Sequence, residues 1–258
     1  MLRFLTWNIR TGGGDRLPAI IEVVKAERPD ILAVQELRDF DGYGGQRLAA
    51  FADATGMTPH LSRSAFGQPV AVLVRPPLRI TRRSSVRWRL HHAAAAVTVP
   101  TGAGPLTVVS THLNPFSPYR RMREARWLAA RHASRAGLVL IAGDLNGLAP
   151  GEDHAAALAE LRPRYRPRHV SPSSGAADTR AVSAFLEAGF ADLGRDAGAT
   201  VPTAGLGGRE FGPMRLDYLL ASPPLAARAG DPHVIRGDVT DHASDHYPVR
   251  VDLDILGG

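Results

Sequence analysis

Acidic, amide and imidazole side chains follow or interrupt short apolar segments from one end of the chain to the other. Apolar runs of this length are typical of buried strands, and a rigid sheet can bring distant strand ends into one cleft. Carboxylates, amides and imidazoles are the groups that bind a hard cation and move protons. The pattern therefore predicts a metal-assisted hydrolase. The side chains are Asn8, Glu36, His112, Asp144, Asn146, Asp217, Asp245 and His246.

An acid and an amide leave one apolar run together. Asp144 and Asn146 directly follow the segment 138–142 and, being two residues apart, are expected on the same side of the chain. A carboxylate can orient or deprotonate water, and an amide can donate to a developing negative oxygen, which suits a phosphoryl centre. The alternative is an Asp/Asn turn that caps the following segment.

Three further groups could surround a cation. Glu36 leaves the apolar run 31–34, and Mg²⁺ needs one or two carboxylates because it keeps several waters. Asn8 is neutral and could complete a metal or phosphate shell. Asp245 and His246 are adjacent, so on an extended chain one would face the metal and the other the scissile group. The alternatives are a helix-start acid at Glu36 and an ordinary loop at Asp245 and His246.

The remaining candidates would hold protons or phosphate. Asp217 lies in an otherwise apolar strand and requires a partner, for which a histidine is the obvious candidate. His112 is interpreted as a donor to a phosphate oxygen, with a hydrogen-bonded structural histidine as the alternative. Arg120 and Arg121 open a helix, where side chains and helix amides could bind an anion. Their alternative is a solvated helix face.

The elements that must position these groups alternate between strands and helices. Because several neighbouring strands lack a crossover helix, the sheets of this α/β fold should be mixed. Predicted strands cover residues 2–7, 31–34, 70–74, 78–81, 93–99, 106–110, 138–142, 216–220 and 249–253. Predicted helices cover residues 17–29, 45–55, 120–136, 151–161 and 177–189.

Composition limits the class of protein. The chain contains no cysteine, which excludes disulfides, thiolate metal sites and a cysteine nucleophile. The formal charge of +6 suggests an anionic partner, but Lys25 is the only lysine and the other basic residues are arginines. The preference for arginine over lysine is typical of a genome with a biased composition and need not reflect selection for a basic surface. The positive charge therefore supports nucleic-acid binding only if the arginines cluster.

Length and hydropathy predict the organisation and location. The 258 residues show no linker, so we expect one domain over residues 1–258, acting as a monomer. No apolar run approaches the roughly 18 to 20 residues needed to cross a bilayer, and the amino terminus lacks the features of a signal peptide. These observations predict a cytoplasmic protein, with secretion as the alternative if an export signal has been removed.

Taken together and in this order, the motifs resemble the endonuclease/exonuclease/phosphatase superfamily, the group of DNase I and exonuclease III. The resemblance covers nearly the whole chain. It implies a four-layered α/β sandwich in which two mixed sheets pack face to face with helices outside, and a Mg²⁺- or Mn²⁺-dependent site at one edge. The matching segments are Thr6-Trp7-Asn8-Ile9, Val34-Gln35-Glu36, Ser110-Thr111-His112-Leu113, Gly143-Asp144-Leu145-Asn146, Arg215-Leu216-Asp217-Tyr218 and Ser244-Asp245-His246.

The resemblance also implies roles for these residues. Glu36 would be the principal metal ligand, with Asn8 and Asp245 near the ion. Asp217 would pair with His246, and Asp144 would align or activate the attacking water, although either Asp144 or His246 could take its proton. Asn146 and His112 would hold phosphate oxygens.

Two positions depart from the family pattern. The segment Gly67-Gln68-Pro69-Val70-Ala71-Val72-Leu73 resembles a strand of the family but contains no glutamate, whereas DNase I-like members use one there to orient the first histidine, which argues against His112 as a general base. The Asn8-Ile9-Arg10 triplet lacks the aspartate that abasic-site endonucleases carry two residues after the asparagine. The resemblance to the DNA-repair subgroup is therefore weaker.

The substrate is not fixed by these motifs, because specificity lies in the loops around a shared centre. Our leading hypothesis is a phosphodiesterase or nuclease acting on nucleic acid. The alternative is a phosphomonoesterase, or a phosphodiesterase of the sphingomyelin or phospholipid type, acting on a small or lipid-derived substrate. The aromatic content of 6% gives little sign of a base-stacking platform. A catalytically dead scaffold is the third reading, and the intact set of acidic, amide and imidazole residues argues against it.

Overall fold

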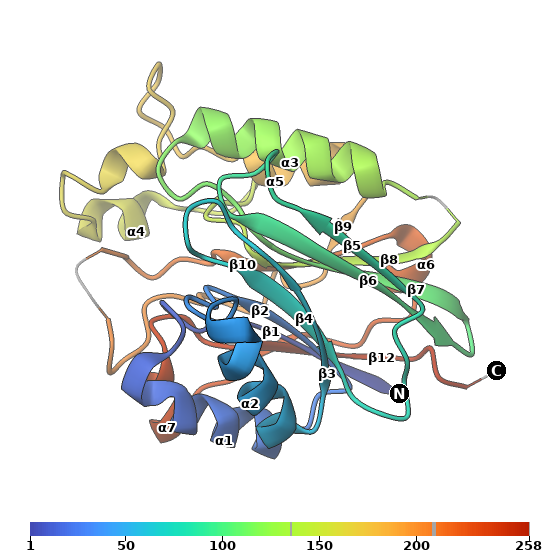
Figure 1. Ribbon diagram of the computed structural model, residues 1–258. Helices are drawn as coiled ribbons and strands as arrows, with labels where there is room; N and C mark the ends of the chain where they lie inside the picture. The colour runs from blue at the N-terminus through green and yellow to red at the C-terminus, as the bar shows by residue number, and fades with distance from the viewer. Residues whose placement is uncertain (135, 208–209, 258) are drawn as a thin grey trace.

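In the computed structural model, which describes residues 1–134, 136–207 and 210–257, two mixed sheets pack face to face (Figure 1). Each sheet has six strands within these residues. In spatial order, sheet A contains β11 (His233–Val234), β12 (Val249–Leu253), β1 (Leu2–Asn8), β2 (Ile31–Gln35), β4 (Val70–Val74) and β3 (Thr58–Ser62). Sheet B contains β5 (Arg82–Val86), β6 (Ala93–Thr101), β7 (Gly104–His112), β8 (Leu138–Asp144), β10 (Asp217–Ala221) and β9 (Ala191–Asp192).

Each sheet combines one parallel pair with antiparallel neighbours. The pair β1 and β2 is parallel in sheet A, and the pair β7 and β8 is parallel in sheet B. Helices α1 (Leu17–Glu27) and α3 (Pro118–His132) belong to the connections within these two pairs. The prediction of mixed sheets is confirmed.

Helices cover the outer faces of both sheets, which confirms the four layers. Figure 1 shows α1, α2 and α7 beside sheet A, and α3 and α5 beside sheet B. Besides α1 and α3, the helices are α2 (Gln46–Thr55), α4 (Ala155–Glu160), α5 (Arg180–Glu187), α6 (Pro223–Ala226) and α7 (Asp238–Ala243). Short 3₁₀ turns lie at Gly14–Arg16, Tyr43–Gly45 and Arg166–Arg168.

Alternation along each strand fills the layers. Ile31 and Ala33 of β2 join the core between the sheets, whereas Leu32 and Val34 pack on the helix side. In β8, likewise, Leu140 lies in the core between the sheets and Ile141 packs on the side of α3 and α5. Strands covered on both faces are apolar throughout, which is why these segments were readable as buried strands.

Some predicted elements were wrong in position or extent. The strand predicted at residues 78–81 lies instead at β5, because the polar edge segment Arg82–Val86 pairs with β6. The half-exposed edge strand β3 was missed because its mostly polar sequence shows no apolar run. Helix α7 was also missed.

Helix ends differ as well. Helix α3 begins two residues before the predicted start, because the Ser117 hydroxyl accepts the Arg120 backbone N–H. It ends at His132, short of the predicted Ala136, and Arg135 lies outside the described residues. Helices α4 and α5 are shorter than predicted. Among the described residues, no helix is both long and apolar enough to span a membrane.

Gly143 permits the close approach of β7 and β8 just before Asp144. Its φ is +134°, and a Cβ there would lie 2.1 Å from the Thr111 carbonyl oxygen and 2.9 Å from Gln35 Nε2. We predict that Gly143→Ala lowers the free energy of unfolding by about 2 to 4 kcal/mol, because the backbone must shift. Urea denaturation measures this change.

Gly147→Ala is the matched control for that substitution. A Cβ at Gly147 meets its nearest neighbour, Ala181 Cβ, at 3.4 Å, which is an ordinary contact. Equal stability losses in the two variants would contradict the steric account of Gly143.

Candidate active site

Sheet B places three candidate residues in one rung. His112 at the end of β7 pairs with Asp144 at the end of β8, and Asp144 pairs with Asp217 at the start of β10. Side chains in one rung share a face. Two residues earlier on β8, Ala142 belongs to the core between the sheets, so Asp144 continues that inward face beyond the apolar core. Strand register therefore brings these three groups together.

Sheet A supplies the opposing groups in the same way. Asn8 at the end of β1 pairs with Gln35 at the end of β2, and Glu36 follows. Gln35 donates to Thr6 Oγ1 at 3.2 Å and to Ser110 Oγ at 3.0 Å. This buried polar layer separates the apolar core from the carboxylates, so acidic groups from both sheets meet above it.

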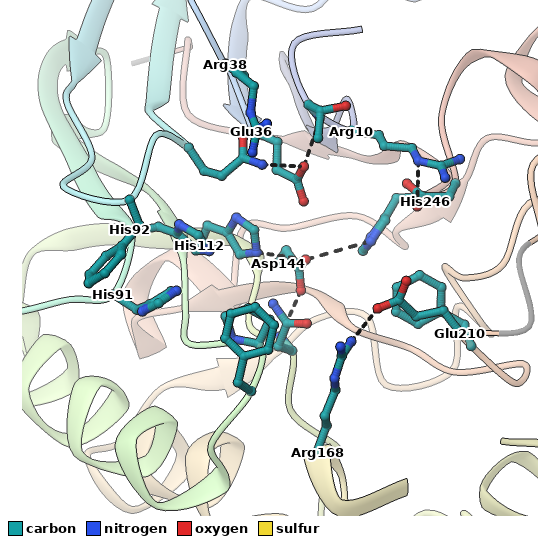
Figure 2. Close-up of a pocket in the computed structure, with 18 of the residues that line it drawn as sticks. Arg10, Glu36, Arg38, His91, His92, His112, Asp144, Arg168, Glu210 and His246 are labelled. Carbon is teal, nitrogen blue, oxygen red and sulfur yellow. Dashed lines mark hydrogen bonds and ion pairs between the residues drawn. The ribbon is translucent and has the colours of Figure 1, made fainter. Parts of the chain in front are cut away.

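The Asp144 carboxylate lies at the centre of the cluster (Figure 2). Its Oδ2 accepts from Asn8 Nδ2 at 3.0 Å and lies 3.4 Å from His112 Nε2 and 3.7 Å from His246 Nε2. Its Oδ1 accepts the Asn146 backbone N–H at 2.8 Å. Burial raises the pKa of Asp144, and the His246 imidazolium works against that rise. Asp144 is therefore a carboxylate prepared to accept a proton.

Glu36 is held at the cleft by neutral donors. Its oxygens accept from Asn8 Nδ2 at 3.1 Å, the Thr11 backbone N–H at 2.8 Å and Gln68 Nε2 at 3.3 Å. Its φ of 61° is left-handed, an unfavourable conformation for glutamate that turns the chain out of β2. Burial raises the pKa of Glu36, because neutral donors do not fully compensate its charge.

His246 and Asp217 form a close pair. His246 Nδ1 lies 2.8 Å from Asp217 Oδ2, which directs Nε2 toward Asp144. The His246 carbonyl accepts from Trp7 Nε1 at 2.8 Å, which fixes this segment against β1. Burial lowers the pKa of His246, but the Asp217 and Asp144 carboxylates outweigh it and raise the value well above 6.5. The imidazole is therefore a cationic donor at neutral pH.

His112 has the opposite electrostatic character. Burial, together with the nearby imidazoles of His92 and His246, lowers the pKa of His112 well below 6.5. Its Nδ1 is buried and has no hydrogen-bond partner among the described residues. The two histidines beside Asp144 thus differ in charge, so they suit different tasks.

The donor set around Glu36 fits a hard cation. Glu36 and Asp245 present carboxylates to the cleft, whereas no three His, Cys, Asp or Glu side chains in the described ranges form a complete metal cage. Mg²⁺ suits such a sparse set because it keeps positions for water and substrate phosphate. Asn8 Oδ1 accepts the Arg10 backbone N–H at 3.0 Å, so Asn8 would have to give up that contact to act as a ligand.

Arginines and aromatic rings line the rest of the cleft, which has a volume of about 460 Å³. Arg10 Nε lies 3.3 Å from Asp245 Oδ2. Arg168 forms an ion pair with Glu210 at the opposite wall, as Figure 2 shows. The other residues that line the cleft include Arg38, Phe66, Gln68, His91, His92, Phe116, His169 and Phe211.

The two arginines predicted to bind substrate lie elsewhere. The Arg121 side chain is buried, and its guanidinium donates to the carbonyl oxygens of Asn114 and Arg168. This placement makes Arg121 a structural support of the cleft and leaves it unavailable to an anion. Arg120 is exposed and is not among the residues that line the cleft.

Sequence reasoning missed the arginines that do line the cleft. Arg10 stands two residues after Asn8, and Arg38 stands two residues after Glu36. Their nearness to predicted ligands was the available signal. Arg168 comes from the short 3₁₀ turn Arg166–Arg168 and Phe66 and Phe116 come from loops, where no periodicity marks the side chains that face a cleft.

The sequence profile of the Endonuclease/Exonuclease/phosphatase family matches residues 5–246, which include all eight candidate metal and catalytic residues. No curated protein matches the chain in sequence.

Solved structures share the fold over nearly the full chain. A mannosyl-6-phosphatase from Bacteroides thetaiotaomicron superposes with a TM-score of 0.70 at 16% identity, over 98% of this chain and 99% of that chain. An AP endonuclease from Archaeoglobus fulgidus gives 0.69 at 22% identity, over 98% and 100%. Truncated TDP2 from Caenorhabditis elegans gives 0.66 at 17% identity, over 97% and 96%. At these identities the likeness shows the fold alone.

The Asp217 contact predicts an unusual titration. In the metal-free protein, the His246 imidazole should stay protonated between pH 6 and 8, because its pKa is raised to about 10. In Asp217→Asn that pKa should fall by more than about one unit, because one of two carboxylates is lost. NMR titration of the imidazole resonances measures both values.

The raised pKa of His246 also makes the free energy of unfolding depend on pH. Because the folded-state pKa exceeds the ordinary value, the extra stability is fully present below pH 6.5 and is lost as pH rises through the folded-state value. An imidazole that titrates near 6.5 in the wild-type protein, unchanged in Asp217→Asn, would contradict this account.

Proposed function

We propose that this chain, which belongs to the endonuclease/exonuclease/phosphatase family, hydrolyses phosphodiester bonds of nucleic acid with the help of a divalent cation. One observation carries the proposal: the Asp144 carboxylate is buried among Asn8, His112 and His246, beside the Glu36 carboxylate. This arrangement supplies a proton acceptor, donors for phosphate oxygens and a position for a cation in one cleft.

Glu36 would hold the cation, with Asp245 and Asn8 beside it. Bound there, Mg²⁺ or Mn²⁺ would neutralise charge on the phosphate. The neutral donors around Glu36 support this role, because they fix the carboxylate without pairing it with a cationic side chain. Arg10 keeps Asp245 at the cleft wall through its 3.3 Å contact.

Asp144 would orient the attacking water and accept its proton. Its Oδ1 and Oδ2 are fixed by Asn146 N–H and Asn8 Nδ2, so the carboxylate is pre-positioned. Its raised pKa brings it closer to the operating pH, where a general base works best. We assign the proton to Asp144 because His246 is already protonated at neutral pH.

His246, His112 and Asn146 would stabilise the phosphate oxygens. The His246 imidazolium offers a charged Nε2–H, held in orientation by Asp217. The neutral His112 can donate one hydrogen bond. Asn146 Nδ2 gives one hydrogen to the Leu113 carbonyl at 3.3 Å, and its second hydrogen remains for the substrate.

Arginines at the cleft favour a polyanionic substrate. Arg10, Arg38 and Arg168 all line it, and Arg10 and Arg168 also contact the Asp245 and Glu210 carboxylates. A small phosphomonoester is the second candidate, because the guanidinium groups that line the cleft could instead hold a terminal phosphate.

Removing the Asp144 carboxylate should strongly reduce turnover while preserving the fold. We expect Asp144→Asn to lower kcat by about 10² to 10⁴, the usual contribution of a positioned general base. We expect Glu36→Gln to abolish the dependence on Mg²⁺ together with activity, and His112→Ala to have a milder effect. The measurement is release of labelled fragments from single-stranded DNA, with and without a chelator.

Glu22→Gln, at an exposed carboxylate on α1, is the matched control and should leave turnover unchanged. A folded Asp144→Asn variant with near-native kcat would overturn the assignment. Robust hydrolysis of p-nitrophenyl phosphate, with intact plasmid and single-stranded DNA left uncleaved, would instead select the phosphomonoesterase.

A further inference from the structure

A line of contacting aromatic rings runs from the rim of the cleft to the Asp144 carboxylate. The Phe66 and His91 rings are parallel within 15° at a centroid distance of 4.3 Å. His91 meets the edge of His92 at 4.5 Å, and His92 stacks on His112 at 4.2 Å. His112 Nε2 in turn lies 3.4 Å from Asp144. The rings therefore connect the rim to the site of chemistry.

Two phenylalanines at the rim expose their rings to the cleft. Phe66 is 61% exposed and Phe116 is 56% exposed, and both line the cleft. Both contact His91: Phe66 stacks on its ring, and Phe116 meets it at right angles at 5.5 Å. We call Phe66, His91 and Phe116 the aromatic corner. Exposed apolar surface beside a polar catalytic centre indicates a binding site for a flat apolar group.

A buried carboxylate outside the catalytic cluster holds the aromatic corner in place. Glu124 of α3 accepts the His91 backbone N–H at 2.6 Å and the Asn114 backbone N–H at 2.7 Å. The Asn114 side chain then accepts the backbone N–H of Phe116 at 2.9 Å. The segments that carry His91 and Phe116 are thus tied to one helix, so these two rings are positioned before a ligand arrives.

Positive charge lies next to the aromatic corner. The Arg168 guanidinium lies over the Phe116 ring at 5.2 Å from its centroid and is paired with Glu210. Arg38 also lines the cleft. A flat group bound at the corner would therefore have cationic side chains nearby for the phosphates that flank it.

We propose that the aromatic corner binds the nucleobase next to the scissile phosphate, so the substrate is a single-stranded or otherwise unpaired nucleotide. This inference rests on the proposed phosphoester hydrolysis and names its substrate class. A base in a duplex has both faces covered by its neighbours and cannot stack on protein rings without leaving the helix. Stacking on aromatic side chains is tolerant of sequence, so little base preference is expected.

A sugar phosphate fits the aromatic corner less well. The mostly equatorial hydroxyl groups at the edges of a pyranose need hydrogen-bond partners that phenylalanine rings do not offer, and its faces present C–H groups without a π-system. A nucleobase presents flat π-faces, which gain most from such rings. The corner therefore favours a base over a pyranose at the same position.

Ligand binding to the inactive Asp144→Asn variant tests this inference separately from catalysis. With Mg²⁺ present, isothermal titration should give a Kd for AMP about 5- to 100-fold below that for ribose 5-phosphate, the usual range for one stacked base. Glucose 6-phosphate should bind no better than ribose 5-phosphate. Adding Phe66→Ala should remove most of the AMP advantage, whereas Phe66→Tyr should retain it.

Tyr43→Ala, at a ring that is 90% exposed and not among the cleft-lining residues, is the matched control and should leave the AMP Kd unchanged. Equal Kd values for AMP and ribose 5-phosphate, tighter binding of glucose 6-phosphate, or no AMP binding by folded protein would overturn the inference. If the wild-type enzyme still cleaves DNA in that case, the proposed function stands and the nucleobase subsite alone fails.

Discussion

Burying a carboxylate where two sheets meet costs several kcal/mol unless donors surround it, and the structure is arranged around this constraint at Asp144. Asn8 comes from one sheet and His112 from the other, while His246 arrives from the segment before β12. Each supplies a polar contact that water would otherwise make. The compensation is incomplete, because burial still raises the pKa of Asp144. The same incompleteness gives the carboxylate its capacity to accept a proton.

Strand register and a hydrogen bond between the two sheets maintain this arrangement. The rung formed by His112, Asp144 and Asp217 sets the spacing within sheet B, and Gln35 joins it to sheet A through Ser110. Because these contacts are made by backbone pairing and buried side chains, the groups that we propose as catalytic would need little reorganisation on binding. The loops around the cleft are the segments that can adapt to a ligand. Glu124 restrains two of them at the rim by accepting the backbone N–H groups of His91 and Asn114.

The fold and the central carboxylates were predictable because buried strands have a distinct apolar signature and the chain leaves them at polar residues. Asp144 and Glu36 follow such runs directly. The function of Arg121 was not predictable, since the direction in which a helix presents a single arginine depends on the packing of α3. Phe66 and Phe116 were missed for a related reason, because only tertiary folding brings residues of distant loops together. The low overall aromatic content also gave no indication that two exposed phenylalanines lie at one rim of the cleft.

We propose that Glu36 and the Asp144 cluster form one metal-assisted centre for phosphoester hydrolysis. The most direct test is an anomalous difference map from a crystal of the protein grown with Mn²⁺ and AMP. We predict a Mn²⁺ peak at coordination distance from a Glu36 carboxylate oxygen, with the phosphate between the metal and His246. A Mn²⁺ peak elsewhere in the cleft, with Glu36 uncoordinated, would contradict the account.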